Sequence, residues 1–177
     1  MTRHISAHVV ALAALVLTFA GCGDREAPTS SLSAKAPRYT VSAGQTTTQL
    51  GRSRVDPFHI QSAFEGHRVE LKSQDPSDII VNSSSLAAGG STGWHTHSGP
   101  VMVVITGGAF TMYHGDDPAC ARTVYPAGTA FIESGGPKDI HIGRNEGSVA
   151  VTWVATAIVA VGAAGRIDVP APGNCPF

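Results

Sequence analysis

Apolar and polar residues alternate in short runs along the second two-thirds of the chain, and turn residues such as Gly, Pro, Asn and Asp separate the runs. Alternation with a period of two is typical of β-strands with one buried face. Helical periodicity is almost absent, so the pattern predicts a β-sandwich or β-barrel. Strands are predicted at residues 68–72, 79–86, 93–97, 101–106, 109–113, 122–125, 129–132, 139–143, 149–158 and 166–169.

Residues 56–66 fit two structures. Phe58, Ile60 and Phe64 are spaced as the apolar positions of a short helix or of an extended edge segment. We assign no function to this stretch, and we interpret its histidine, His59, and the neighbouring His67 as ordinary polar residues.

The first 21 residues predict a signal peptide. The apolar run from Val9 to Ala20 is shorter than the roughly 20 residues that span a bilayer, and it follows Arg3, as in a secretory leader. The run ends in Leu-Thr-Phe-Ala-Gly-Cys, which resembles a bacterial lipobox and would make Cys22 the lipidated first residue of the mature protein. Ordinary cleavage near Ala20, giving a freely secreted protein, is the alternative. Both place the protein outside the cytoplasm, in the cell envelope or secreted.

Residues 22–52 are rich in Ser, Thr, Ala and Pro and poor in large apolar residues. Such a segment buries too little surface to offset its chain entropy. It predicts a flexible tether that holds one domain, residues 53–177, away from a membrane. A recognition role for the segment has no motif to support it.

The chain has three cysteines. With Cys22 assigned to the leader, Cys120 and Cys175 form an even pair in an oxidising compartment, which predicts a disulfide that fastens the C-terminal tail. Two free thiols are the alternative. A metal site is not expected at either, since neither has another cysteine or a histidine at ligand spacing.

The formal net charge is −1, and removal of Arg3 with the leader makes it more negative by one. The sequence contains no basic cluster suited to phosphates. Nucleic acid is therefore excluded as an expected partner.

His95 and His97 are the first candidate functional residues. One residue separates them, so on a strand both side chains project to the same face while Trp94 and Thr96 project to the other. Neutral imidazole is the commonest metal-ligating side chain. The pair predicts half of a metal site if its face points inward.

The surrounding residues resemble the cupin family. That family's first motif reads G, five residues, H-x-H, three or four residues, E, six residues, G. Gly89, His95, His97 and Gly108 match it, but Val101 stands where the glutamate is expected. The second motif, G, five residues, P-x-G, two residues, H, three residues, N, is matched in parts, with a longer gap before its histidine and without its first glycine. The matching residues are Pro126, Gly128, His141 and Asn145.

The resemblance implies an all-β jelly-roll barrel with His95, His97 and His141 as metal ligands. Three imidazoles suit zinc, iron, copper, manganese or nickel, and the sequence does not select one. Glu133 is the candidate substitute for the missing glutamate, because it shares strand parity with Phe131, which stands where the family has its histidine. It would ligate the ion, act as a general base, or hydrogen-bond a ligating histidine.

Other candidate residues have simpler interpretations. Asn145 is expected to fix a turn through side-chain hydrogen bonds, and Trp94 and Trp153 to pack in the core or at its rim. The remaining histidines are expected to be solvated or structural; they are His4, His8, His59, His67 and His114.

Three functions remain open at this stage: a metal-dependent enzyme such as an oxygenase, a non-catalytic module binding a small ligand, and a structural barrel with a degenerate site. The apolar run at residues 149–161 fits either a homodimer contact or a strand buried on both faces.

Overall fold

The computed structural model describes residues 40–177, and these residues form strands, turns and loops without a helix. The predicted signal peptide and the proposed lipidation residue Cys22 lie outside the described residues. Within them, no helix has the length and apolar character needed to cross a bilayer. The twelve strands are β1 Ala43–Val55, β2 Phe58–Phe64, β3 His67–Ser73, β4 Ser77–Ser91, β5 His95–Thr96, β6 Val101–Gly107, β7 Ala109–His114, β8 Thr123–Pro126, β9 Ala130–Glu133, β10 His141–Arg144, β11 Val151–Ala160 and β12 Ile167–Asp168.

All ten strands predicted from alternation are present, so the all-β prediction is confirmed. Of the two further strands, β1 was not predicted, and β2 was predicted only as one of two alternatives for residues 56–66. The tether prediction is wrong for residues 43–52, because this stretch of Thr, Gln and Gly belongs to β1 and pairs with β4 along almost its whole length. Many side chains of β1 are polar because they border a cavity or the solvent. This polar composition is the reason that the segment was interpreted as a flexible tether. The stretch 56–66 is extended, in agreement with the second of its two interpretations.

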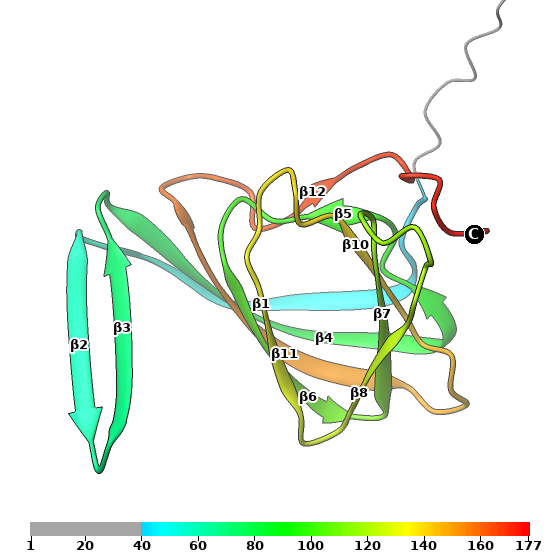
Figure 1. Ribbon diagram of the computed structural model, residues 1–177, viewed down its shortest axis with the longest axis horizontal. Helices are drawn as coiled ribbons and strands as arrows, with labels where there is room; N and C mark the ends of the chain where they lie inside the picture. Colours follow the sequence, from blue (N-terminus) through cyan, green and yellow to red (C-terminus); the bar gives the residue numbers. More distant parts are fainter. Residues whose placement is uncertain (1–39) are drawn as a thin grey trace, which may run out of the picture. The chain divides into compact units, whose positions relative to one another are not determined.

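Ten of the strands build a jelly-roll barrel from two facing groups (Figure 1), and β2 and β3 form a separate two-stranded hairpin. One group runs β1, β4, β11, β6, β9, and every neighbouring pair in it is antiparallel. The other joins β12, β5, β10, β7 and β8. A single pair, Arg144 with Ser91, links β10 to β4 and connects the two groups.

The buried apolar residues form two clusters. The larger contains Leu86, Ile105, Val151 and Trp153, from the three strands β4, β6 and β11, whose side chains alternate in and out. The smaller is built on Trp94, which is 1% exposed and packs with Ile142 and Tyr113. Both tryptophans therefore pack in the core, as predicted. On β11 only the inward face is fully buried, and the outward residues are partly exposed.

The C-terminal tail is tied to the barrel beside the smaller cluster. Cys120 and Cys175 form the expected disulfide, with their Cα atoms 5.3 Å apart. The neighbouring Asn174 side chain donates hydrogen bonds to the carbonyl oxygens of His114 and Asp117. The tail is thus fixed by one covalent link and two polar contacts.

A buried carboxylate joins β4 to β1. Both Nε and Nη2 of Arg52 donate to one oxygen of Asp78, at 2.8 and 2.6 Å, and the Gly162 N–H donates to the same oxygen at 2.9 Å. The Gly162 N–H and the Arg52 guanidinium hold the pKa of Asp78 below its ordinary value of 3.8. Asp78 is therefore charged under ordinary conditions.

We expect Asp78→Asn to lower the stability of the protein near pH 6, and the difference to shrink as the pH falls below the ordinary pKa of 3.8. Because the folded pKa is lowered, the carboxylate stabilises the fold fully above the unfolded pKa, and this contribution is lost as the pH falls through the folded pKa. Urea denaturation midpoints of wild type and variant measured from pH 7 to pH 2.5 test this. The exposed Asp56→Asn change is the matched control, and a pH-independent difference for Asp78→Asn would contradict the prediction.

Candidate metal centre

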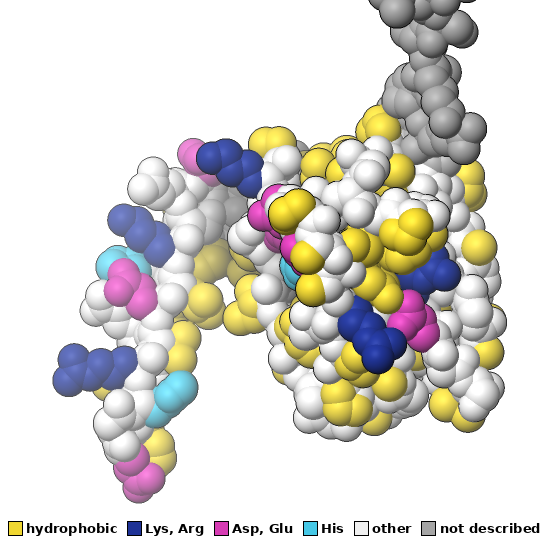
Figure 2. Space-filling view, turned by 45° about the vertical axis from the view of Figure 1, so that its right-hand side comes forward, with side chains coloured by type: hydrophobic (Ala, Val, Ile, Leu, Met, Phe, Trp, Pro, Cys, Tyr) yellow, Lys and Arg dark blue, Asp and Glu magenta, His cyan; other side chains and the backbone are white. Residues whose placement is uncertain are grey.

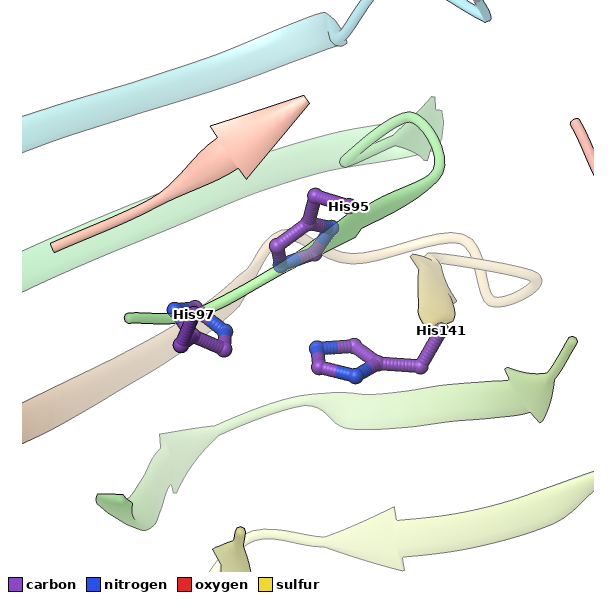
Figure 3. A group of neighbouring side chains, drawn as sticks. All are labelled: His95, His97 and His141. Atoms are coloured by element: carbon purple, nitrogen blue, oxygen red, sulfur yellow. The ribbon is translucent and has the colours of Figure 1, made fainter. Parts of the chain in front are cut away.

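Two adjacent strands bring the three predicted histidines together. β5 carries His95, His97 follows directly after β5, and the backbone of His95 pairs with that of His141 on β10. A glycine turn places them: Gly93 has φ of +71°, and a Cβ there would lie 2.1 Å from the Thr40 carbonyl oxygen. Only glycine fits this close approach at positive φ. Figure 3 shows the three rings converging on one point.

The imidazoles are close enough to share one ion. One nitrogen from each of His95, His97 and His141 lies within 4.8 Å of the others. Ring centroids are 5.0 Å apart for His95 and His97, 4.5 Å for His95 and His141, and 5.2 Å for His97 and His141. His95 and His141 are buried and His97 is nearly so.

Backbone carbonyls set which nitrogen of two rings faces the cluster. Nδ1 of His95 lies 2.8 Å from the Gly93 carbonyl oxygen, and Nδ1 of His97 lies 2.7 Å from that of Gly165. A carbonyl oxygen only accepts, so each Nδ1 carries the hydrogen. In the neutral ring each Nε2 then has the free lone pair, the form that ligates a metal.

Asp139 stands behind the third histidine. Its Oδ1 lies 3.4 Å from His141 Nδ1, an arrangement in which a carboxylate orients a ligating imidazole and raises its basicity. Asp139 also accepts hydrogen bonds from the Gly135 N–H and the Ser134 hydroxyl. Sequence inspection missed Asp139, although it stands two residues before His141 in the predicted strand 139–143, where alternation would put both on one side.

Glu133 reaches the cluster from β9. Its two carboxylate oxygens lie 3.1 Å from His97 Nε2 and 3.1 Å from His141 Nε2. On the ladder between β6 and β9, Glu133 pairs with Val101, the position where the family motif has its glutamate. A carboxylate is thus supplied from the adjacent strand at the same height in the barrel.

Burial and neighbouring charges shift the pKa values of these groups. Burial lowers the pKa of His95 well below its ordinary value, and His141 and Arg166 act in the same direction, so His95 is neutral. Burial alone would lower the pKa of His141, but Asp139 and Glu133 raise it to about 9. Burial would raise the pKa of Glu133, but the neighbouring imidazoles of His141 and His97 lower it to about 2. Glu133 is therefore a charged carboxylate, and His141 favours positive charge whereas His95 does not.

The arrangement fits a cation. Nε2 of His97 is buried and has no hydrogen-bond partner among the described residues, and the same is true of Nε2 of His141. In the neutral ring of His97 with its hydrogen on Nδ1, Nε2 presents a lone pair to a charged carboxylate oxygen 3.1 Å away. Two acceptors at this distance repel unless positive charge lies between them. Three imidazoles and one carboxylate are also a usual donor set for divalent transition metals.

A cavity of about 380 Å³ opens beside the histidines. One side is lined by amides and hydroxyls of β1 and β4, namely Gln45, Thr47, Gln49, Asn82 and Ser84. The other side is apolar and is lined by Val101, Val103, Phe110, Phe131 and Trp153. Both Phe131 and Glu133 border the cavity, which confirms their shared parity. The β1 amides were not predicted, because that strand was interpreted as tether.

The other candidate residues lie elsewhere. Asn145 is buried, and its amide donates to the carbonyl oxygens of Leu86 and Val149, so its predicted structural role is confirmed. His114 is near the cluster, but its ring centroid is 6.4 Å from that of His141 and it is not among the converging nitrogens. His59 contacts Glu70 on the β2–β3 hairpin, and His67 is exposed there. His4 and His8 lie outside the described residues.

No known family model matches the sequence, and neither does any curated protein. Solved structures do resemble the chain. A Klebsiella pneumoniae protein with a double-stranded beta-helix domain is 19% identical over 64% of this chain and 84% of its own, with a TM-score of 0.42. A cupin domain from Bordetella pertussis is 19% identical over 62% of this chain and 100% of its own, with a TM-score of 0.40. A Streptococcus pyogenes protein of unknown function is 17% identical over 46% of this chain, with a TM-score of 0.39, and the chain spans 64% of its length.

Proposed function

We propose that this protein is an exported cupin that holds a divalent transition metal through His95, His97 and His141, with Glu133 beside them, and receives a small molecule in the adjoining cavity. The observation that carries the metal proposal is the hydrogen bonding of the rings. Backbone carbonyls take the Nδ1 hydrogens of His95 and His97, so their Nε2 lone pairs face the cluster and the Glu133 carboxylate.

The cavity supports a ligand with two kinds of surface. Amides such as Gln49 and Asn82 offer both donors and acceptors, whereas Phe131 and Trp153 offer apolar contact. The two arginines at the cavity, Arg52 and Arg166, are already paired with Asp78 and Asp168. We therefore propose a small oxygen-bearing compound that is largely uncharged along its length and presents one oxygen group to the histidine end.

A bound divalent ion would act as a Lewis acid on that oxygen group. The chain's own residues supply the rest. The charged Glu133 is placed to accept a proton from a ligand beside His97 and His141, and the apolar side chains of the cavity limit its water content. These features support an enzyme, such as an oxygenase, over a structural barrel. A binding module that retains its ligand without turnover is the second candidate, favoured by the amide-lined wall.

The cell-envelope location is also proposed. It is supported by the leader-like start and the Leu-Thr-Phe-Ala-Gly-Cys sequence, through which Cys22 would anchor the protein to a membrane. The disulfide between Cys120 and Cys175 is consistent with an oxidising compartment outside the cytoplasm.

Metal titration tests the central proposal. The full chain, stripped with a chelator and dialysed against Zn²⁺, Mn²⁺, Ni²⁺, Cu²⁺ or Fe²⁺, is expected to retain near one equivalent of at least one ion. An ion at about 100 times its Kd should stabilise the fold by about 2.7 kcal/mol. Glu133→Gln removes a negative charge beside two ligands and should weaken binding about 10- to 100-fold.

Glu65→Gln, in the exposed turn between β2 and β3, is the charge-matched control and should bind the metal like wild type. If no ion is retained and none raises the unfolding temperature, the metal proposal is wrong. If Glu133→Gln binds as tightly as wild type, Glu133 has no role beside the ion.

A further inference from the structure

The hairpin of β2 and β3 has one apolar face and one polar face. Its strands pair with each other only, through the two-residue turn Glu65-Gly66, where both residues have positive φ. Residues paired across the ladder share a face. Phe58, Ile60, Phe64, Val69 and Leu71 fall on one face, and the charged residues Arg68, Glu70 and Lys72 on the other. Figure 2 shows charged and apolar atoms on opposite sides of this hairpin.

The apolar face is exposed. Phe64 is 72% exposed, Ile60 56%, Leu71 43% and Val69 41%. A two-stranded hairpin on its own is at best marginally stable in water, and a third layer against its apolar face is what normally stabilises it. Neither strand pairs with a strand of the barrel. This hairpin therefore needs a surface to cover it.

The barrel presents a second surface that lacks charge. The outward-pointing residues of β4, β11 and β6 lie side by side in rows across the three paired strands. None of these outward residues is charged. Val104 on this face is 49% exposed, and Ile132 on the adjoining strand β9 is 73% exposed. The outward residues are Ile79, Val81, Ser83 and Ser85 on β4, Thr152, Val154, Thr156 and Ile158 on β11, and Met102, Val104 and Thr106 on β6.

We infer that this protein forms a two-fold dimer in which the apolar face of each hairpin packs on the uncharged outer barrel face of the other copy. Each chain carries one surface of each kind, so two copies cover both, as a closed symmetric pair requires. A different partner on the hairpin would leave the barrel face, with Val104 and Ile132, uncovered.

One hairpin contact buries too little area for a stable interface, so each copy must cover the barrel face of the other. Seven residues per strand, at about 3.3 Å each, and two strands about 4.8 Å apart give each hairpin face roughly 220 Å² in projection. One hairpin on one barrel face buries about 450 Å² in total, which is typical of a crystal contact. Two such contacts bury roughly 900 Å² in projection, and more as accessible surface, near the ~1,000 Å² of a specific interface.

Sedimentation equilibrium of the full chain tests the dimer. Wild type is expected to be a dimer at micromolar concentration. Ile60→Asp with Leu71→Asp should raise the dimer Kd about 100-fold or more, because it places charge on the contact face of the hairpin. Val104→Asp, on the receiving face, should do the same. Gln61→Asp with Ala63→Asp adds the same charge to the polar face of the hairpin and should leave the dimer intact.

Metal content and the unfolding temperature measured on each variant separate loss of the dimer from misfolding, and they separate this inference from the metal proposal. A wild type that is monomeric up to about 100 μM overturns it, as does a dimer that survives both contact-face changes. Binding to vesicles of phosphatidylethanolamine and phosphatidylglycerol is measured as a second experiment. A monomeric wild type that binds them, and loses binding on Ile60→Asp with Leu71→Asp, would assign the hairpin to lipid and overturn the dimer.

Discussion

Replacing His95 and His97 together with alanine is expected to abolish metal binding. The change removes two of three converging imidazoles, and loss of a single residue that merely orients a ligand already costs about 10- to 100-fold in affinity. We expect the affinity to fall more than about 1,000-fold, so that elemental analysis finds near one ion per wild-type chain and less than about one-tenth in the variant. The barrel should still fold, since neither ring belongs to an apolar cluster.

The matched control removes two histidines from the β2–β3 hairpin instead, as His59→Ala with His67→Ala. Both lie on exposed strands away from the converging nitrogens, so this variant should retain its metal. Equal metal content in the two variants would mean that the ion binds adventitiously at the surface, and the proposed centre would be wrong.

Loss of the disulfide is expected to have the largest effect on stability. Cys120 and Cys175 are 55 residues apart in sequence, and in the chain-entropy model closing a loop of this size stabilises the fold by about 4 kcal/mol. Cys120→Ser with Cys175→Ser should lower the free energy of unfolding by about that amount. Chemical denaturation of both proteins, analysed as a two-state transition, measures the difference.

Cys175 also packs with Trp94, Tyr113 and Ile142, so the serine variant loses some apolar contact as well. Wild type measured under a reductant isolates the covalent link, because its side chains are otherwise unchanged. If reduced and oxidised wild type unfold at the same denaturant concentration, the tail contributes nothing through the disulfide and the expected 4 kcal/mol is wrong.

Much of the barrel could be predicted because its strands alternate cleanly. On β6, the residues Val101, Val103 and Ile105 point inward between partly exposed ones, and glycines and prolines mark both ends. β1 could not be predicted in this way. Its inward residues, such as Gln49, form the polar wall of the cavity. Both faces of β1 are therefore hydrophilic, and the sequence shows no alternation of apolar and polar residues.

The candidate site was predictable where its signal is local. The H-x-H spacing fixes the shared side of His95 and His97 from strand geometry alone, and the resemblance placed His141 with them. Asp139 was missed although it stands two residues before His141. The contribution of the Gly165 carbonyl could not be read from spacing, because it depends on how a distant loop packs against the ring of His97. Glu133 was predicted only because it lies two positions after Phe131 on one strand, so that both side chains point to the same face.

The pairing of Val101 with Glu133 bears on how such centres are recognised. Two residues opposite each other on an antiparallel ladder occupy nearly the same place in a barrel, although here more than thirty positions separate them in the sequence. A functional group can therefore move from one strand to its neighbour during evolution while the geometry it serves is preserved. Searches for divergent relatives should accept the carboxylate at either member of such a pair, since a linear motif discards chains in which it has changed strands.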